Sequence, residues 1–115
     1  MITISGLSSL PNQIFRVPLE DGSIVKFQLV YKPSIQMWFI DIEYNNFNVK
    51  GMRVVNLLNM LTQYINIIPF GLYVEISDGT EPLLINDFSS KRVILNILTQ
   101  AEVQELDQAY MDANA

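Results

Sequence analysis

Two carboxylates spaced two residues apart are the first candidates for chemistry in this sequence. Asp41 and Glu43 alternate with apolar residues, so both side chains project from one face of a predicted strand. Paired carboxylates act as acid and base in glycosidases, and they also bind divalent metal ions. The simpler interpretation is a solvated strand face, or a carboxylate that meets Lys26 or Arg53 across the sheet. We favour the simpler interpretation because this spacing is common in sheets.

The sequence lacks the residues that most other kinds of catalytic or binding site require. The chain contains no Cys and no His, which excludes zinc fingers, iron–sulfur sites, thiol enzymes and Ser-His-Asp triads. The five glycines are too far apart for a phosphate-binding loop. The acidic segments 20–23 and 78–81 lack the spacing of calcium loops, and their Asp-Gly pairs predict turns. We therefore expect no catalytic residue, no metal site, no cofactor and no enzymatic activity.

Several aromatic residues lie near the single tryptophan in the sequence. Trp38 lies beside Phe39, and Tyr31 and Tyr44 are close in sequence. Such a group can form a stacking platform for a sugar or for single-stranded nucleic acid. However, Trp38 shares the apolar face of its strand with Ile40, which favours a tryptophan in the protein core.

Composition limits the partners. The chain has 115 residues, 50% of them hydrophobic, with 12 acidic and 7 basic residues and a formal charge of −5. One domain of this size buries roughly 65% of its unfolded surface and needs no disulfide or metal. The acidic balance argues against nucleic acid as a partner. Residues 1–11 do not resemble a signal peptide, and no segment approaches the roughly 20 apolar residues of a membrane span, so we expect no membrane partner.

The elements that position these residues are mainly strands. Apolar and polar residues alternate in six short segments, 13–19, 24–31, 37–44, 47–50, 72–77 and 92–98. Pro18 marks the first of them as an edge strand because proline cannot donate to a ladder. Residues 56–64 predict a loop or one helical turn, and residues 82–85 a brief extended piece. The pattern indicates a mainly β fold, a single small antiparallel β-sandwich or barrel with a C-terminal α-helix.

The chain divides into three predicted parts. Residues 1–12 form an N-terminal arm or extension, residues 13–98 the β domain, and residues 99–115 an acidic C-terminal helix. Thr99 and Glu102 have the spacing of a capping box, which starts the helix. Behind it, one helical face carries Val103, Leu106 and Tyr110. The helical segment holds four acidic residues and no basic residue.

Several motifs between residues 15 and 98 occur together in one known family. They are an Asp-Gly hairpin, Trp38-Phe39-Ile40-Asp41-Ile42, Gly51-Met52-Arg53-Val54, Leu57-Leu58, Gly71-Leu72-Tyr73-Val74 and the apolar closing strand 93–98. In order and spacing, these motifs resemble the baseplate plug family of contractile-tailed phages. The first dozen residues and the acidic helix are not part of that pattern.

The resemblance implies a non-enzymatic structural component of the phage tail baseplate. Such a protein is made in the host cytoplasm and becomes part of the virion, as one copy in a homo-oligomeric ring at the tail tube or hub. Other tail and baseplate proteins are its expected partners. We expect an edge strand, the one with Pro18 or the segment 1–5, to extend a neighbour's sheet. The alternation of Ile2 and Ile4 predicts an arm that orders only on assembly.

The acidic helix has two possible roles. It could dock on a basic surface of a tube or hub protein, or it could pack its apolar stripe on its own β domain. We favour the second role because the stripe of Val103, Leu106 and Tyr110 is narrow but present.

Two alternatives belong to other functional classes. One is a small ligand-binding β-barrel of the lipocalin kind, which needs about eight long strands where this sequence predicts six short ones. The other is a carboxylate enzyme built on Asp41 and Glu43. Replacing both carboxylates by amides separates the enzyme from the structural protein, because a structural protein should assemble unchanged.

Overall fold

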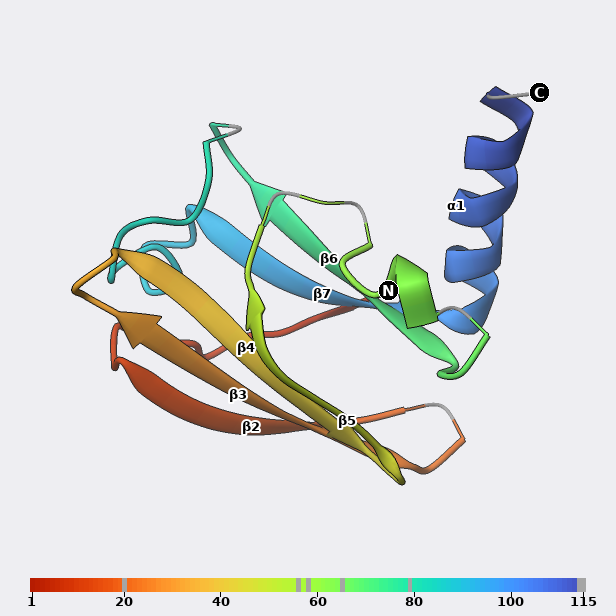
Figure 1. The fold of residues 1–115 in the computed structure, drawn as a ribbon, viewed down its shortest axis with the longest axis horizontal. Coiled ribbons are helices and arrows are strands. Elements are labelled where there is room, and N and C mark those ends of the chain that lie inside the picture. The colour runs from red at the N-terminus through yellow and green to blue at the C-terminus, as the bar shows by residue number, and fades with distance from the viewer. Residues whose placement is uncertain (20, 56, 58, 65, 79, 114–115) are drawn as a thin grey trace.

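The chain forms two antiparallel sheets that pack face to face, with a helix at the C-terminal end (Figure 1). This computed structural model describes residues 1–19, 21–55, 57, 59–64, 66–78 and 80–113. Sheet A has the strand order β1-β7-β6, and sheet B has the order β2-β3-β4-β5. The elements are β1 (Ile2–Thr3), β2 (Asn12–Pro18), β3 (Ile24–Lys32), β4 (Met37–Tyr44), β5 (Phe47–Arg53), the 3-10 helix η1 (Thr62–Tyr64), β6 (Phe70–Ile76), β7 (Val93–Thr99) and α1 (Gln100–Ala113).

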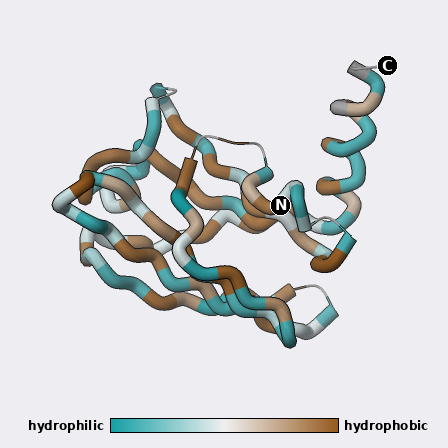
Figure 2. The backbone as a smooth tube through the Cα atoms, viewed as in Figure 1, coloured by the Kyte–Doolittle hydropathy of each residue, from teal (hydrophilic) through white to brown (hydrophobic). Residues whose placement is uncertain are grey.

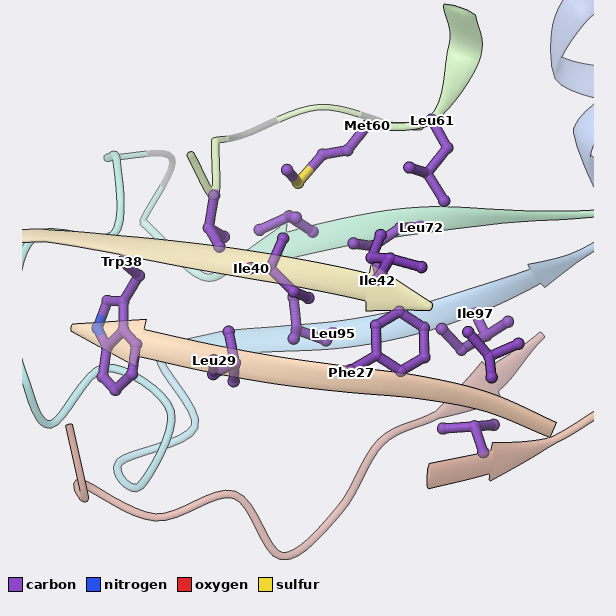
Figure 3. Packing of buried hydrophobic residues seen from close by; sticks show 14 of the residues in the cluster. Phe27, Leu29, Trp38, Ile40, Ile42, Met60, Leu61, Leu72, Leu95 and Ile97 are labelled. Carbon is purple, nitrogen blue, oxygen red and sulfur yellow. The ribbon is translucent and has the colours of Figure 1, made fainter. Parts of the chain in front are cut away.

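One apolar core fills the space between the sheets, which confirms the predicted sandwich. Side chains from both sheets point toward one another, and the largest of them are fully buried (Figure 3). Among these are Phe27, Leu29, Trp38, Ile40, Ile42, Leu72, Leu95 and Ile97. Among the residues that the structure describes, no strand pairs across the two sheets, so the fold is a sandwich and not a closed barrel.

Sheet B follows the predicted alternation of apolar and polar residues (Figure 2). Successive side chains of a strand point to opposite faces, so every second residue of β3 is buried. The predicted hairpin between β2 and β3 is confirmed, with Phe15 stacked on Phe27 at 5.2 Å between ring centroids. Its turn closes through the Leu19 amide, which donates to the Ser23 carbonyl at 2.8 Å. Gly22 supplies the positive φ of +87° in this turn, and Glu20 lies outside the described residues.

Strand β5 is longer than the predicted segment 47–50. Gly51 has a φ of +70° at a shift in register, after which Met52 pairs with Ile40 and the ladder continues. A glycine in this conformation is typical of a β-bulge, which adds a residue without ending the strand. The sequence predicts a short strand at 47–50 that could continue through 51–55, and the strand does continue, as far as Arg53.

Sheet A includes the N-terminal residues. Ile2 pairs with Ile97 and Thr3 pairs with Asn96, and the Ile4 amide donates to the Leu95 carbonyl at 2.9 Å. The sequence predicts a separate arm over residues 1–12, whereas its first residues already form β1 in the single chain. The reason is that β1 satisfies backbone groups at the outer edge of β7. Whether residues 13–98 fold without the flanking segments stays a prediction.

The segments between β5 and β7 are mostly loops. The predicted single helical turn is η1, so that interpretation is confirmed. The predicted extended piece at 82–85 belongs to no strand. Two of the turn and motif residues, Leu58 and Gly79, lie outside the described residues.

Helix α1 begins with the predicted capping box. The Glu102 amide donates to the Thr99 hydroxyl at 3.2 Å, and the Thr99 amide donates to the Glu102 carboxylate at 3.0 Å. These bonds satisfy two backbone donors at the helix start. The pKa of Glu102 is lowered, first by the N-terminal amine 2.7 Å away and then by the Thr99 amide.

The first turn of α1 packs on sheet A. Val103 is buried there, and a Cβ added to Gly71 would lie 2.8 Å from its Cγ2 atom. This confirms the contact of the helix with its own β domain; the side chain of Tyr110 lies outside the described part. No helix among the described residues is both long and apolar enough to cross a membrane.

Candidate assembly surfaces

The two candidate carboxylates lie on the outer face of sheet B. Asp41 is half-buried, and its Oδ1 atom accepts the Gly51 amide at 2.6 Å, which ties β4 to the bulge of β5. Glu43 is exposed and lies opposite Lys26 in the β3–β4 register. Within the described ranges, no three carboxylates gather into a group that could hold a metal ion. In this arrangement Asp41 stabilises the β5 bulge by accepting the Gly51 amide.

Trp38 is a core residue. Its side chain is fully buried, with the Tyr31 and Phe88 rings at centroid distances of 5.0 Å and 4.9 Å. The indole Nε1 donates to the Leu84 carbonyl at 2.9 Å, and the Tyr31 hydroxyl donates to the Leu83 carbonyl at 2.8 Å. An aromatic platform needs exposed ring faces, so Trp38 does not form one.

A charged cluster that the sequence analysis missed fixes the β6–β7 loop. Arg92 binds the buried Asp87 through two bonds, Nε to Oδ1 at 2.8 Å and Nη2 to Oδ2 at 2.9 Å. Its Nη1 atom also donates to Asp78 at 2.7 Å and to the Thr80 hydroxyl at 2.6 Å. Asp87 in turn accepts the Leu84 amide at 2.8 Å. The paired guanidinium and carboxylate thus hold both ends of the loop together.

The electrostatics of this cluster follow from its hydrogen bonds. Asp87, which is only 1% exposed, raises the pKa of Arg92 through the hydrogen bonds between the two side chains. The pKa of Asp78 lies below its usual value, first because the Thr80 hydroxyl and amide donate to it and then because of Arg92. No sequence motif marked the cluster, because residues 87–91 resemble an ordinary polar loop and Arg92 a strand start.

The clamped loop presents an exposed apolar surface. We name Leu83, Leu84 and Ile85 the loop-end patch; these side chains are 40%, 55% and 42% exposed. The β3–β4 turn, which carries the exposed Ile35, lies at the same end of the sandwich (Figure 1). Consecutive exposed apolar side chains of this kind can mark a contact surface.

The edges of the two sheets differ. In sheet A, β1 covers β7, and the loop before η1 covers β6. There the Met60 amide donates to the Leu72 carbonyl at 2.8 Å, and the Val74 amide donates to the Leu57 carbonyl at 3.2 Å. In sheet B, the outer strands β2 and β5 have no further paired strand among the described residues. Only sheet B therefore offers long edges.

The register shows which groups of β2 face outward. The Tyr31 amide binds the Pro11 carbonyl, and the Leu19 amide binds the Ser23 carbonyl, so odd-numbered residues bond to β3. Because bonding alternates along an antiparallel strand, Asn12, Ile14 and Arg16 direct their backbone groups away from the sheet. The Ile14 side chain is 54% exposed.

Charge separates the two sheets as well. The strands of sheet B carry five of the seven basic residues, Arg16, Lys26, Lys32, Lys50 and Arg53. Sheet A and α1 contain no Lys or Arg and carry the acidic residues Glu75, Glu102, Glu105, Asp107 and Asp112. The strands of sheet B also carry Asp41 and Glu43, so sheet B has a net excess of basic residues, whereas sheet A and α1 carry acidic residues alone.

Comparison with known protein families identifies a family that covers most of the chain. Residues 1–100 match the family described as cyanophage baseplate Pam3 plug gp18. No curated protein matches this chain. The matched residues include both sheets and end at the first residue of α1.

Proposed function

Because this chain belongs to the cyanophage baseplate plug family, we propose that it is a ring subunit of a contractile phage tail. It is made in the host cytoplasm and assembles in the baseplate around the tail tube or hub. Its work is mechanical, without catalysis or a cofactor. The family supports a structural role in the baseplate, and the surfaces of the chain support the way in which it assembles.

The open edges of sheet B are the observation that carries the ring proposal. Strands β2 and β5 lie at opposite edges of the same sheet. Pairing β2 of one copy with β5 of the next uses different surfaces on the two copies, and such head-to-tail contacts form a ring when the rotation from copy to copy closes, and an open filament when it does not. Unpaired edge groups are ready partners for this contact. The outward backbone groups of Asn12, Ile14 and Arg16 supply the β2 half.

The loop-end patch supports a second contact. Loops lie at the ends of strands, so in a ring joined edge to edge they point above or below the ring. Leu83, Leu84 and Ile85 are held there by the Arg92–Asp87 cluster. We assign the patch to the tube or hub protein next to the ring.

Phage particles test the assignment to the baseplate directly. We expect mass spectrometry of purified virions to detect the chain, and antibody-gold electron microscopy to label the baseplate end of the tail. A chain absent from virions, or labelling along the whole tail, would contradict the proposal. No observation favours the ligand-binding barrel, since the two sheets do not close into one.

A further inference from the structure

A groove separates α1 from the outer face of sheet A. It has a volume of about 330 Å³ and is lined by Met1, Tyr73, Leu98, Glu102, Glu105 and Leu106. Figure 1 shows why it exists: the helix meets the sheet at its first turn and then rises away from it. Gly71 and Val103 anchor that first turn.

The floor and one wall of the groove are apolar. Tyr73 and Leu98 come from neighbouring strands of sheet A, and Leu106 comes from α1. Tyr73 and Leu106 are only partly buried, so the groove leaves apolar surface in water. Burial of such surface by a partner is favourable in rough proportion to its area.

A buried donor lies beside the floor. Asn96 pairs with Tyr73 in the register and shares the face of Leu98, two residues further along β7. Its Oδ1 atom accepts the Thr3 hydroxyl at 2.7 Å, but its Nδ2 atom has no partner among the described residues. A buried donor without a partner is uncommon. Asn96 is 1% exposed and does not line the groove, so a partner would bind through the apolar lining and the acidic rim.

The rim of the groove is acidic. Glu102 and Glu105 line it, and Glu75 is exposed two residues after Tyr73 on β6. The N-terminal amine already binds Glu102 at 2.7 Å. Because β1, β6, β7 and α1 contain no Lys or Arg, the remaining acidic residues have no basic neighbour on their own elements. Lysine or arginine on a partner would complement this rim.

The groups that sheet A presents indicate what kind of partner can bind there. β1 pairs with Ile97 and Asn96 of β7, and the loop residues Leu57 and Met60 bind backbone groups of β6. The groove lies on the outer face of the sheet, where side chains and not backbone groups project. A partner there therefore docks through side chains, as an amphipathic helix does in an apolar groove.

We propose that this groove binds an amphipathic helix whose apolar face is flanked by lysine or arginine. The partner's source, a neighbouring baseplate protein, rests on the proposed function. The helical wall of the groove lies outside the residues that match the plug family, apart from its first residue.

A synthetic peptide tests this binding on the full chain. The probe is a fluorescent 14-residue peptide of Leu and Lys, with Leu at helical spacing on one face, and the control peptide is its scrambled form. We expect the amphipathic peptide to bind at least about tenfold more tightly in fluorescence anisotropy, equal to about 1.4 kcal/mol. Equal affinity for the two peptides would overturn the proposal.

Variants locate the binding. Leu106→Asp should weaken binding at least about tenfold, whereas Gln104→Asp, which adds the same charge at an exposed position outside the groove lining, should not. Glu105→Lys is a second variant at an exposed position, so it should fold normally and still repel the basic peptide. Unchanged affinity in Glu105→Lys, or equal losses in Leu106→Asp and Gln104→Asp, would overturn the proposal. Absence of the chain from virions would instead contradict the baseplate function and leave the peptide result standing.

Discussion

Sheets A and B contribute similar apolar faces to one core but present different surfaces to their surroundings. Sheet A has covered edges, no basic residue in its strands, and a helix anchored on its outer face. Sheet B has two edges that no strand of the described residues covers, and its strands carry five basic residues. Core packing therefore does not distinguish the two sheets, whereas edges and charge do. The difference indicates that sheet B joins copies of the chain and that sheet A receives a different partner.

The β6–β7 loop links the two regions. It connects the strands of sheet A, yet Trp38 and Tyr31 of sheet B bind the carbonyls of Leu84 and Leu83. Arg92 and Asp87 hold the loop in the shape that allows these bonds. Changes in the loop should thus affect both sheets, whereas changes on the outer face of one sheet should affect mainly that sheet.

The largest expected effect comes from removing the charged clamp that joins the sheets. Arg92→Ala leaves the Asp87 carboxylate, 1% exposed, without its partner. Breaking a buried ion pair from one side costs about 3–5 kcal/mol in the free energy of unfolding. Chemical denaturation measures this loss. Lys91→Ala is the control, and its change should stay within about 0.5 kcal/mol because Lys91 is exposed. Equal effects of the two variants would show that the clamp does not hold the loop.

A change at Gly71 should affect sheet A alone. In Gly71→Ala the new Cβ would lie 2.8 Å from both Val103 Cγ2 and Asn59 Oδ1, so α1 or the loop must shift. Overpacking of this kind costs about 1–3 kcal/mol. Thermal unfolding measures the loss, and NMR should place the shifted amides in α1 and around Asn59.

The matched control for Gly71→Ala relieves part of the clash. Adding Val103→Ala removes the Cγ2 atom that the new Cβ meets. In the double variant, the chemical shifts of the α1 amides should therefore lie closer to the wild-type values than they do in Gly71→Ala. Its affinity for the amphipathic Leu-Lys peptide should also lie closer to the wild-type affinity. Shifts spread equally through sheet B would contradict the separation of the two regions.

A pH below the ordinary pKa of a carboxyl should loosen the β6–β7 loop at Asp78. The hydrogen bonds from Thr80 lower the pKa of Asp78 below 3.8. A carboxyl with a lowered pKa stabilises the fold above its ordinary value, and this contribution is lost as pH falls through the pKa of the folded state. The Thr80 amide resonance should therefore titrate below pH 3.8. An Asp78→Asn variant should lack this titration. A midpoint at or above 3.8 would contradict the assigned bonds.

The smallest effect is expected on the outer face of sheet B. Asp41→Asn combined with Glu43→Gln keeps an oxygen that can accept the Gly51 amide. The free energy of unfolding should change by no more than about 0.5 kcal/mol, and assembly should be unchanged. Native mass spectrometry and denaturation check both statements. A loss of assembly would assign these carboxylates a contact between copies.

Much of the fold follows from local patterns in the sequence. Alternation in β3, the Asp-Gly hairpin and the capping box at Thr99 depend on neighbouring residues, so they could be predicted. The burial of Trp38 followed from the apolar face that it shares with Ile40. The strand length of β5 could not be predicted, because the bulge at Gly51 is recognisable only once β4 lies beside it.

The features that matter for assembly depend on contacts that the sequence pattern does not reveal. Asp87 and Arg92 come together because the loop folds back on β7, and β1 reaches sheet A from the far end of the chain. The covering of β6 by Leu57 and Met60 likewise depends on tertiary packing. The groove beside α1 then follows from where the capping box places the helix.

Native mass spectrometry of the wild type and of two variants at Ile14 tests assembly through the edge of sheet B most directly. Ile14→Pro removes an outward amide of β2, whereas Ile14→Ala removes most of the side chain and keeps the amide. We predict ring-sized multiples of the 13.1 kDa chain for the wild type and for Ile14→Ala, and folded monomers for Ile14→Pro. Wild-type protein that stays monomeric, or rings that persist in Ile14→Pro, would contradict assembly through this edge.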